Sequence, residues 1–184
     1  MSSPEITLEL FSRDQDREGD LLRLGKVSVD GAGGELVYVG RVAHMLSDAG
    51  LAPLPKEAFN SVLADEVDRI AGLIWGDDWS RALAELAGIN RRTTARDRVK
   101  KFGLPPDLVR GLVRLSERDD AREVAGIARA VARYWDTHAA APPEQAMDGM
   151  MRVIGDFRGP GHFDRWLDGL MGIDWDEGEG ETIP

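Results

Sequence analysis

Residues 79–98 decide the fold of this chain, and they read WSRALAELAGINRRTTARDR. The first half favours a short helix, because Ala, Leu and Glu are strong helix formers. Gly88 stands where a helix ends in the left-handed conformation, and Ile89 is expected to cover the core beneath that turn. Asn90 is a good N-cap for a second helix, which we predict over residues 91–101. Two helices joined by a tight turn are therefore expected here.

This pattern resembles the helix-turn-helix domain of bacterial and phage transcriptional regulators, the repressor-like class. The chain departs from that family at Thr94, where an aliphatic residue is usual, and at Asp97, where a tryptophan or similar core anchor is usual. In the family, the helix after the turn is the recognition helix, which enters the major groove of DNA. The resemblance implies that DNA is contacted by residues of that helix: Asn90, Arg91, Arg92, Thr93 and Arg96.

Charge is strongly segregated along the chain, although its formal net value is -10. Residues 1–80 carry 7 basic and 15 acidic side chains, residues 81–134 carry 13 and 7, and residues 144–184 carry 3 and 10. The field near the central basic block governs encounters with a polyanion more than the total charge does. Further basic side chains are expected to contact phosphates around the recognition helix: Arg81, Arg98, Lys100 and Lys101, with Arg110 and Arg114 beyond them.

The fold expected from these patterns is mainly α, with a helical helix-turn-helix core, a small N-terminal α/β module of short strands, and C-terminal helices. Prolines near residue 54 and an Ala-Pro-Pro stretch before residue 144 are read as linkers. They divide the chain into an α/β module at 1–52, a helix-turn-helix domain at 56–138, a helical pair at 144–172 and an acidic tail at 173–184.

Within the N-terminal module, apolar residues alternate with polar ones, which is typical of half-buried strands. Strands are predicted at 6–10, 27–29 and 36–39, a turn at 31–34, and a helix from 42 to about 50.

After residue 55 the apolar spacing becomes helical. Helices are predicted from residue 56 to about 76, from 107 to about 115, and from 119 to 134, and Trp135 is expected to pack in the core.

Several function classes are excluded by composition. The chain has no cysteine, which removes thiol nucleophiles and zinc–thiolate sites, and its three histidines have no second histidine at i+3 or i+4. We therefore expect no enzymatic activity, no cofactor and no metal. The sequence has no run of 18 apolar residues of the kind that spans a membrane, and no secretory leader is evident. A cytoplasmic protein is therefore expected.

Two functions of different classes remain open. The first is a DNA-binding transcriptional regulator that acts as a homodimer on double-stranded DNA, because one recognition helix reads too few base pairs for a specific site. The second is an acidic adaptor or inhibitor, DNA-mimic-like and of the kind that phages encode, which docks on a basic nucleic-acid-binding partner. Met and aromatic residues between 147 and 175 also suit a C-terminal apolar surface for a protein partner.

Overall fold

The computed structural model describes residues 4–12 and 16–138, together with residues 145, 149 and 153. The chain divides into two compact units, Met1–Asp136 and Thr137–Pro184. The predicted helical pair at 144–172 falls almost entirely outside the described residues, and the predicted tail at 173–184 falls wholly outside them. None of the helices in the described part of the chain has both the length and the apolar character of a membrane-spanning segment.

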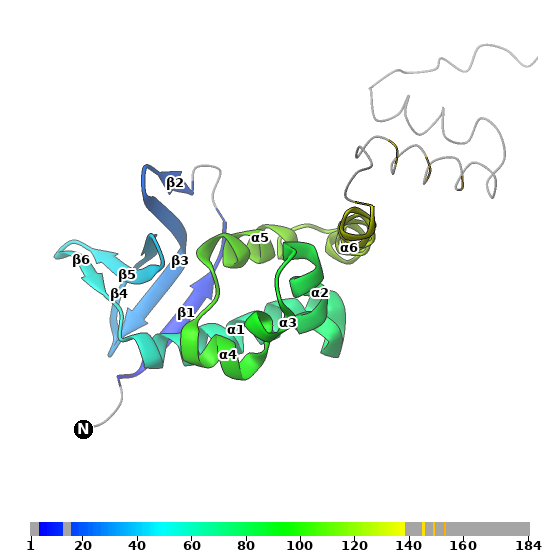
Figure 1. Cartoon of the computed structure of the whole chain (residues 1–184). Coiled ribbons are helices and arrows are strands. Elements are labelled where there is room, and N and C mark those ends of the chain that lie inside the picture. Colours follow the sequence, from blue (N-terminus) through cyan, green and yellow to red (C-terminus); the bar gives the residue numbers. More distant parts are fainter. Residues whose placement is uncertain (1–3, 13–15, 139–144, 146–148, 150–152, 154–184) are drawn as a thin grey trace, which may run out of the picture. The chain divides into compact units, whose positions relative to one another are not determined.

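The first unit begins with a six-stranded antiparallel sheet (Figure 1). The strands run in the order β1-β3-β4-β5-β6, and the short β2 pairs with one end of β3. Their bounds are β1 Ile6–Leu10, β2 Arg17–Glu18, β3 Leu21–Val29, β4 Ala32–Val39, β5 Val42–Ser47 and β6 Gly50–Pro53.

The expected fold class, mainly α with a small N-terminal α/β module, is wrong. Strands come first and helices follow, and the sheet is a full layer of the fold rather than an appendage, as in α+β proteins. The strands predicted at 6–10, 27–29 and 36–39 are confirmed as parts of β1, β3 and β4.

Residues 42–47 form strand β5, although a helix was predicted there. A short apolar run cannot be assigned to helix or strand by periodicity alone, and the hairpin decides it. Val39 pairs with Val42 across a two-residue turn, which sets β4 and β5 in register.

The predicted turn at 31–34 is also misplaced. The turn is Asp30–Gly31, where both residues have positive φ (50° and 84°), as the favoured hairpin turns require, and residues 32–34 belong to β4.

The helical part follows Pro55. Its elements are α1 Lys56–Trp75, the 3-10 turn η1 Gly76–Asp78, α2 Trp79–Ala87, α3 Arg91–Thr94, α4 Arg96–Phe102, α5 Pro106–Ser116 and α6 Ala121–Thr137. The helices predicted at 56–76, 107–115 and 119–134 are confirmed with small shifts of their ends. The single helix predicted at 91–101 is wrong, because Ala95 is extended (φ -62°, ψ 136°) and divides it into α3 and α4.

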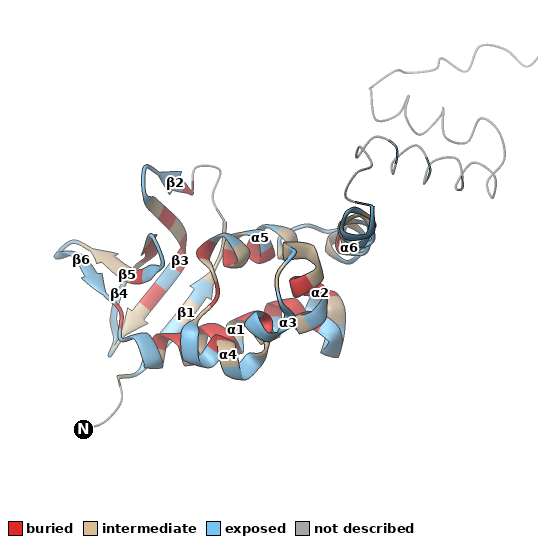
Figure 2. Cartoon of the chain, viewed as in Figure 1, coloured by how far each residue is buried: buried red, intermediate tan, exposed pale blue. Residues whose placement is uncertain are grey.

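Sheet and helices share one hydrophobic core. α1 packs against β1, α4 and α5, and the buried positions of the elements face one another (Figure 2). Leu36 of the sheet, Leu63 of α1 and Leu112 of α5 belong to the same buried cluster, and each is at most 2% exposed. Residues on both sides of the Pro53–Pro55 stretch therefore stabilise one another. Trp135 was expected in the core, but it is 47% exposed at the end of α6.

A buried carboxylate ties the sheet to α5. Asp16, which precedes β2, is 2% exposed and accepts a hydrogen bond from Arg110 Nε at 2.7 Å, while Arg114 Nη2 lies 2.9 Å away. Burial raises the pKa of Asp16, but the hydrogen bond from Arg110 and the charges of both arginines outweigh it and hold that pKa below its ordinary value. Two arginines expected at a phosphate-contacting rim, Arg110 and Arg114, are thus paired with a buried carboxylate.

Candidate nucleic-acid interface

The turn between α2 and α3 has the geometry that the sequence predicts. Gly88 lies in the left-handed region (φ 61°, ψ 32°), and the next amide, of Ile89, donates to the Ala84 carbonyl oxygen at 3.1 Å. The side-chain oxygen of Asn90 accepts a hydrogen bond from the Arg92 amide at 2.8 Å. The predicted roles of Gly88 as helix terminator and of Asn90 as N-cap are therefore confirmed, while Ile89 is half-buried.

The two departures from the helix-turn-helix pattern have clear places in the structure. Thr94 is fully buried, and its hydroxyl lies 2.7 Å from the Ser80 carbonyl oxygen and 2.9 Å from the Arg91 carbonyl oxygen, so it has acceptors at hand. That contact holds α3 against α2. Asp97 is exposed in the first turn of α4, where a carboxylate suits the helix dipole. Neither residue leaves an unsatisfied polar group in the core.

Arg91 and Arg92 are the most available cations of the predicted site. Both are exposed on α3, and within the described residues neither side chain makes an ion pair or hydrogen bond. Thr93 is exposed beside them. The Asn90 side-chain oxygen accepts the capping bond, so its NH2 group is the part of this side chain that is left to contact a ligand.

Other predicted basic residues are paired with carboxylates. Arg96 of α4 lies 3.1 Å from Asp65 and 3.2 Å from Asp68, and Lys100 lies 3.3 Å from Asp65. The hydrogen bond from Arg96 is the main reason that the pKa of Asp65 lies below its ordinary value. Carboxylates of α1 thus neutralise one side of α4, which reduces what these two cations offer to a phosphate.

Arg81 is paired as well, through Glu85 on the next turn of α2. Glu85 accepts hydrogen bonds from Arg129 Nε of α6 at 2.5 Å and from Arg81 Nε at 2.8 Å. The bond from Arg129, helped by that from Arg81, outweighs partial burial and lowers the pKa of Glu85 to about 2. Arg129 also bonds Asp78 at 2.9 Å, so this cluster attaches α6 to the start of α2.

The end of α4 carries a feature that the sequence reasoning missed. Phe102 is 54% exposed, and two cations lie over its ring: Arg98 Cζ at 5.4 Å and Lys101 Nζ at 5.3 Å from the centroid. The ring borders a pocket of about 350 Å³ whose other lining residues are Asn90, Arg92, Thr93, Arg98 and Gly103. An aromatic residue ending a basic helix just before a glycine is the sequence signal that could have identified it.

The basic side chains of α3 and α4 that have no carboxylate partner among the described residues form, with their polar neighbours, a surface that we name the α3–α4 surface. It consists of Asn90, Arg91, Arg92, Thr93, Arg98 and Lys101. Of the nine residues predicted to bind DNA, four line the pocket beside Phe102, namely Asn90, Arg92, Thr93 and Arg98, and Lys101 lies over the Phe102 ring. Arg91 borders a separate hollow with Arg81 and Glu85. Arg81, Arg96 and Lys100 are held in the ion pairs described above.

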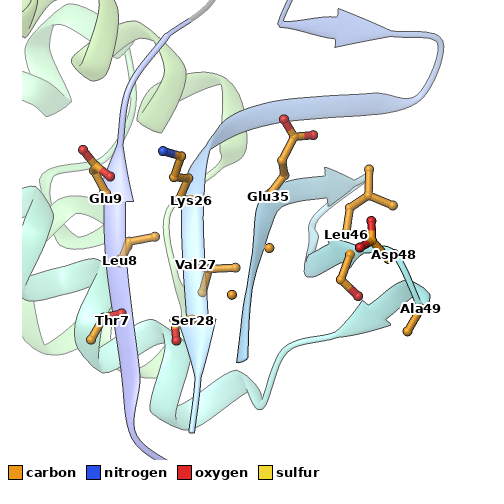
Figure 3. A pocket seen from close by; sticks show the side chains of 13 residues that line it. Thr7, Leu8, Glu9, Lys26, Val27, Ser28, Glu35, Leu46, Asp48 and Ala49 are labelled. Carbon is orange, nitrogen blue, oxygen red and sulfur yellow. The ribbon is translucent and has the colours of Figure 1, made fainter. Parts of the chain in front are cut away.

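A second hollow lies on the face of the sheet and was not predicted. It measures about 790 Å³ and crosses β1, β3, β4 and β5 (Figure 3). Glu9, Lys26 and Glu35 occupy facing positions on three neighbouring strands, and Asp48 lies at the β5–β6 turn. Its small floor residues include Gly33, where a side chain would meet open space. Carboxylates outnumber cations in this hollow.

Comparison with known proteins gives no family: neither protein-family models, nor curated proteins, nor solved structures match this chain. Among the described residues, no cluster of three or more histidine, aspartate or glutamate side chains is arranged to hold a metal ion.

Proposed function

We propose that this protein binds double-stranded DNA through the α3–α4 surface, as a transcriptional regulator of the helix-turn-helix class. The observation that carries the proposal is the pair Arg91 and Arg92, which are exposed and have no carboxylate partner among the described residues, directly after a capped turn. Unpaired guanidinium groups bind phosphates and guanine edges without first breaking an internal ion pair.

The division of the predicted recognition helix into α3 and α4 limits which residues can contact the bases of DNA. α3 has only four residues, so only Arg91, Arg92 and Thr93 are available to enter a groove. Arg98 and Lys101 of α4 supply phosphate contacts, which position a protein on DNA rather than specify a sequence. Because a helix as short as α3 contacts few base pairs, the proposed active form is a homodimer.

The test is fluorescence anisotropy on labelled duplex DNA across a salt series, with the wild type compared to Arg91→Ala/Arg92→Ala. The double variant is expected to bind more weakly. Each of the two arginines takes about 0.9 off the slope of log K against log salt only if it contacts a phosphate, so the slope falls by at most about 1.8. Arg41→Ala is the control for the loss of a single exposed cation elsewhere, because Arg41 is exposed on a sheet turn and makes no ion pair among the described residues. Absence of binding at low salt would refute the proposal.

A second candidate is docking on a basic protein, and the sheet hollow favours it through Glu9 and Asp48. A chain acting this way fails to bind DNA and instead binds a polycationic peptide. That binding would weaken in Glu9→Gln/Asp48→Asn and persist in Arg91→Ala/Arg92→Ala, so one set of variants separates the two functions.

A further inference from the structure

Phe102 lies on the surface and takes no part in the hydrophobic core. The buried residue of α4 is Val99, which is fully enclosed, whereas more than half of Phe102 is exposed. An exposed large aromatic ring keeps apolar area in contact with water, and such rings gain free energy when a flat ligand covers them. The ring also borders a pocket of about 350 Å³, which lies within the size range of small-ligand sites.

The side chains around the ring are of the types that contact nucleotides. Arg98 Cζ and Lys101 Nζ lie over the ring, 5.4 and 5.3 Å from its centroid, so a base that stacks on Phe102 takes the place of one of these cation–π contacts. Arg92 adds a third cation to the pocket, and Thr93 adds a hydroxyl. Proteins that bind unpaired nucleotides combine these parts: an aromatic ring stacks on the base, cations contact the flanking phosphates, and polar side chains contact the base edge.

We propose that this pocket holds one unpaired nucleobase, stacked on Phe102, with its flanking phosphates bound by Arg92 and Arg98. This inference rests on the proposed DNA-binding function and narrows its substrate to DNA that carries an unpaired nucleotide beside a duplex. The duplex part contacts Arg91, and the neighbouring pocket receives the extruded base. Fully paired DNA leaves the Phe102 ring exposed and therefore binds less tightly.

The experiment compares two labelled DNA hairpins that differ only in one bulged nucleotide, with dissociation constants measured by anisotropy at one salt concentration. Stacking of a base on an aromatic side chain is worth enough to make the bulged hairpin bind about tenfold more tightly to the wild type. Phe102→Leu reduces this ratio to about one, and Phe102→Trp preserves it. Trp135→Leu, which removes another exposed aromatic residue outside the pocket, serves as the control and leaves the ratio unchanged.

The outcomes separate the inference from the function on which it rests. If neither hairpin binds at low salt, the DNA-binding function itself fails. If both bind equally and Phe102→Leu changes nothing, DNA binding stands and the base-stacking inference is overturned. Circular dichroism confirms that each variant folds, and Phe102→Trp offers a second comparison in which the aromatic ring is kept.

Discussion

The substitution Asp65→Asn is predicted to strengthen DNA binding, because it releases cations that α1 now neutralises. Asp65 pairs with Arg96 at 3.1 Å and with Lys100 at 3.3 Å. Asparagine keeps the size of the side chain and removes its charge. The carboxylate side chain is 56% exposed, so the lost pairs cost folding less than about 1 kcal/mol.

The size of the effect follows from the ion pairs. Lys100 loses the one carboxylate with which it pairs among the described residues, whereas Arg96 keeps Asp68 at 3.2 Å. One additional cation becomes available to a phosphate, which steepens the slope of log K against log salt by about 0.9. Lowering the salt from about 0.2 M to about 0.05 M then tightens binding by roughly threefold more than in the wild type.

The assay is the same anisotropy salt series, with Asp48→Asn as control. Asp48 is exposed at the β5–β6 turn and has no ion pair in the described part of the chain, so this variant makes the same change in net charge on the sheet. A general effect of net charge would shift both variants equally. Identical slopes for Asp65→Asn and Asp48→Asn would refute the reasoning that Lys100 is released onto DNA.

Three further predictions concern stability. The pKa of Glu85 is lowered to about 2 from an ordinary 4.5, so its interaction with Arg129 stabilises the fold above about pH 4.5 and is lost as the pH falls towards 2. In Glu85→Gln, the part of the free energy of unfolding that is lost on acidification should be smaller by on the order of 1–3 kcal/mol, measured by urea unfolding at several pH values. Asp16→Asn should lower the free energy of unfolding at pH 7 by about 2 kcal/mol, since Arg110 loses a buried partner, and an unchanged urea midpoint would contradict this. Gly88→Ala should cost about 1 kcal/mol, because the residue must keep a positive φ, and equal thermal midpoints for variant and wild type would argue against that strain.

The turn of the candidate site could be predicted because its determinants are local. Gly88 ends α2, and Asn90 caps α3 through a bond only two residues away, so the residue types alone specify this geometry. The division of the following helix could not be predicted in the same way. Thr94 is held by the carbonyl oxygen of Ser80 on α2, a contact 14 residues away, and Ala95 is extended. Packing between helices overrides helix propensity there.

The sheet was underestimated for a related reason. The Asp30–Gly31 pair is the strongest short-range signal for a hairpin. It predicts the hairpin correctly only if residues 32–34 are assigned to a strand rather than to the turn. Pairing with β4 places Ala43 opposite Tyr38, and Ala43 is the buried residue of β5. Pairing between strands therefore determines that these residues form strands, which the short apolar runs alone do not specify.

The net charge of -10 is compatible with the proposed DNA-binding role because some cations are paired with carboxylates and others are not. Arg96 and Lys100 of α4 face the carboxylates of α1, and Arg81 faces Glu85. The cations Arg91, Arg92, Arg98 and Lys101 of α3 and α4 make no ion pair within the described residues, and the last two lie over Phe102. Internal pairing thus reduces diffuse attraction to any phosphate backbone and leaves available charge beside a pocket that contains an aromatic ring and cations together. If the proposed function holds, DNA that fills the pocket gains most over DNA that does not, and the carboxylates of α1 then contribute to selectivity as well as to stability.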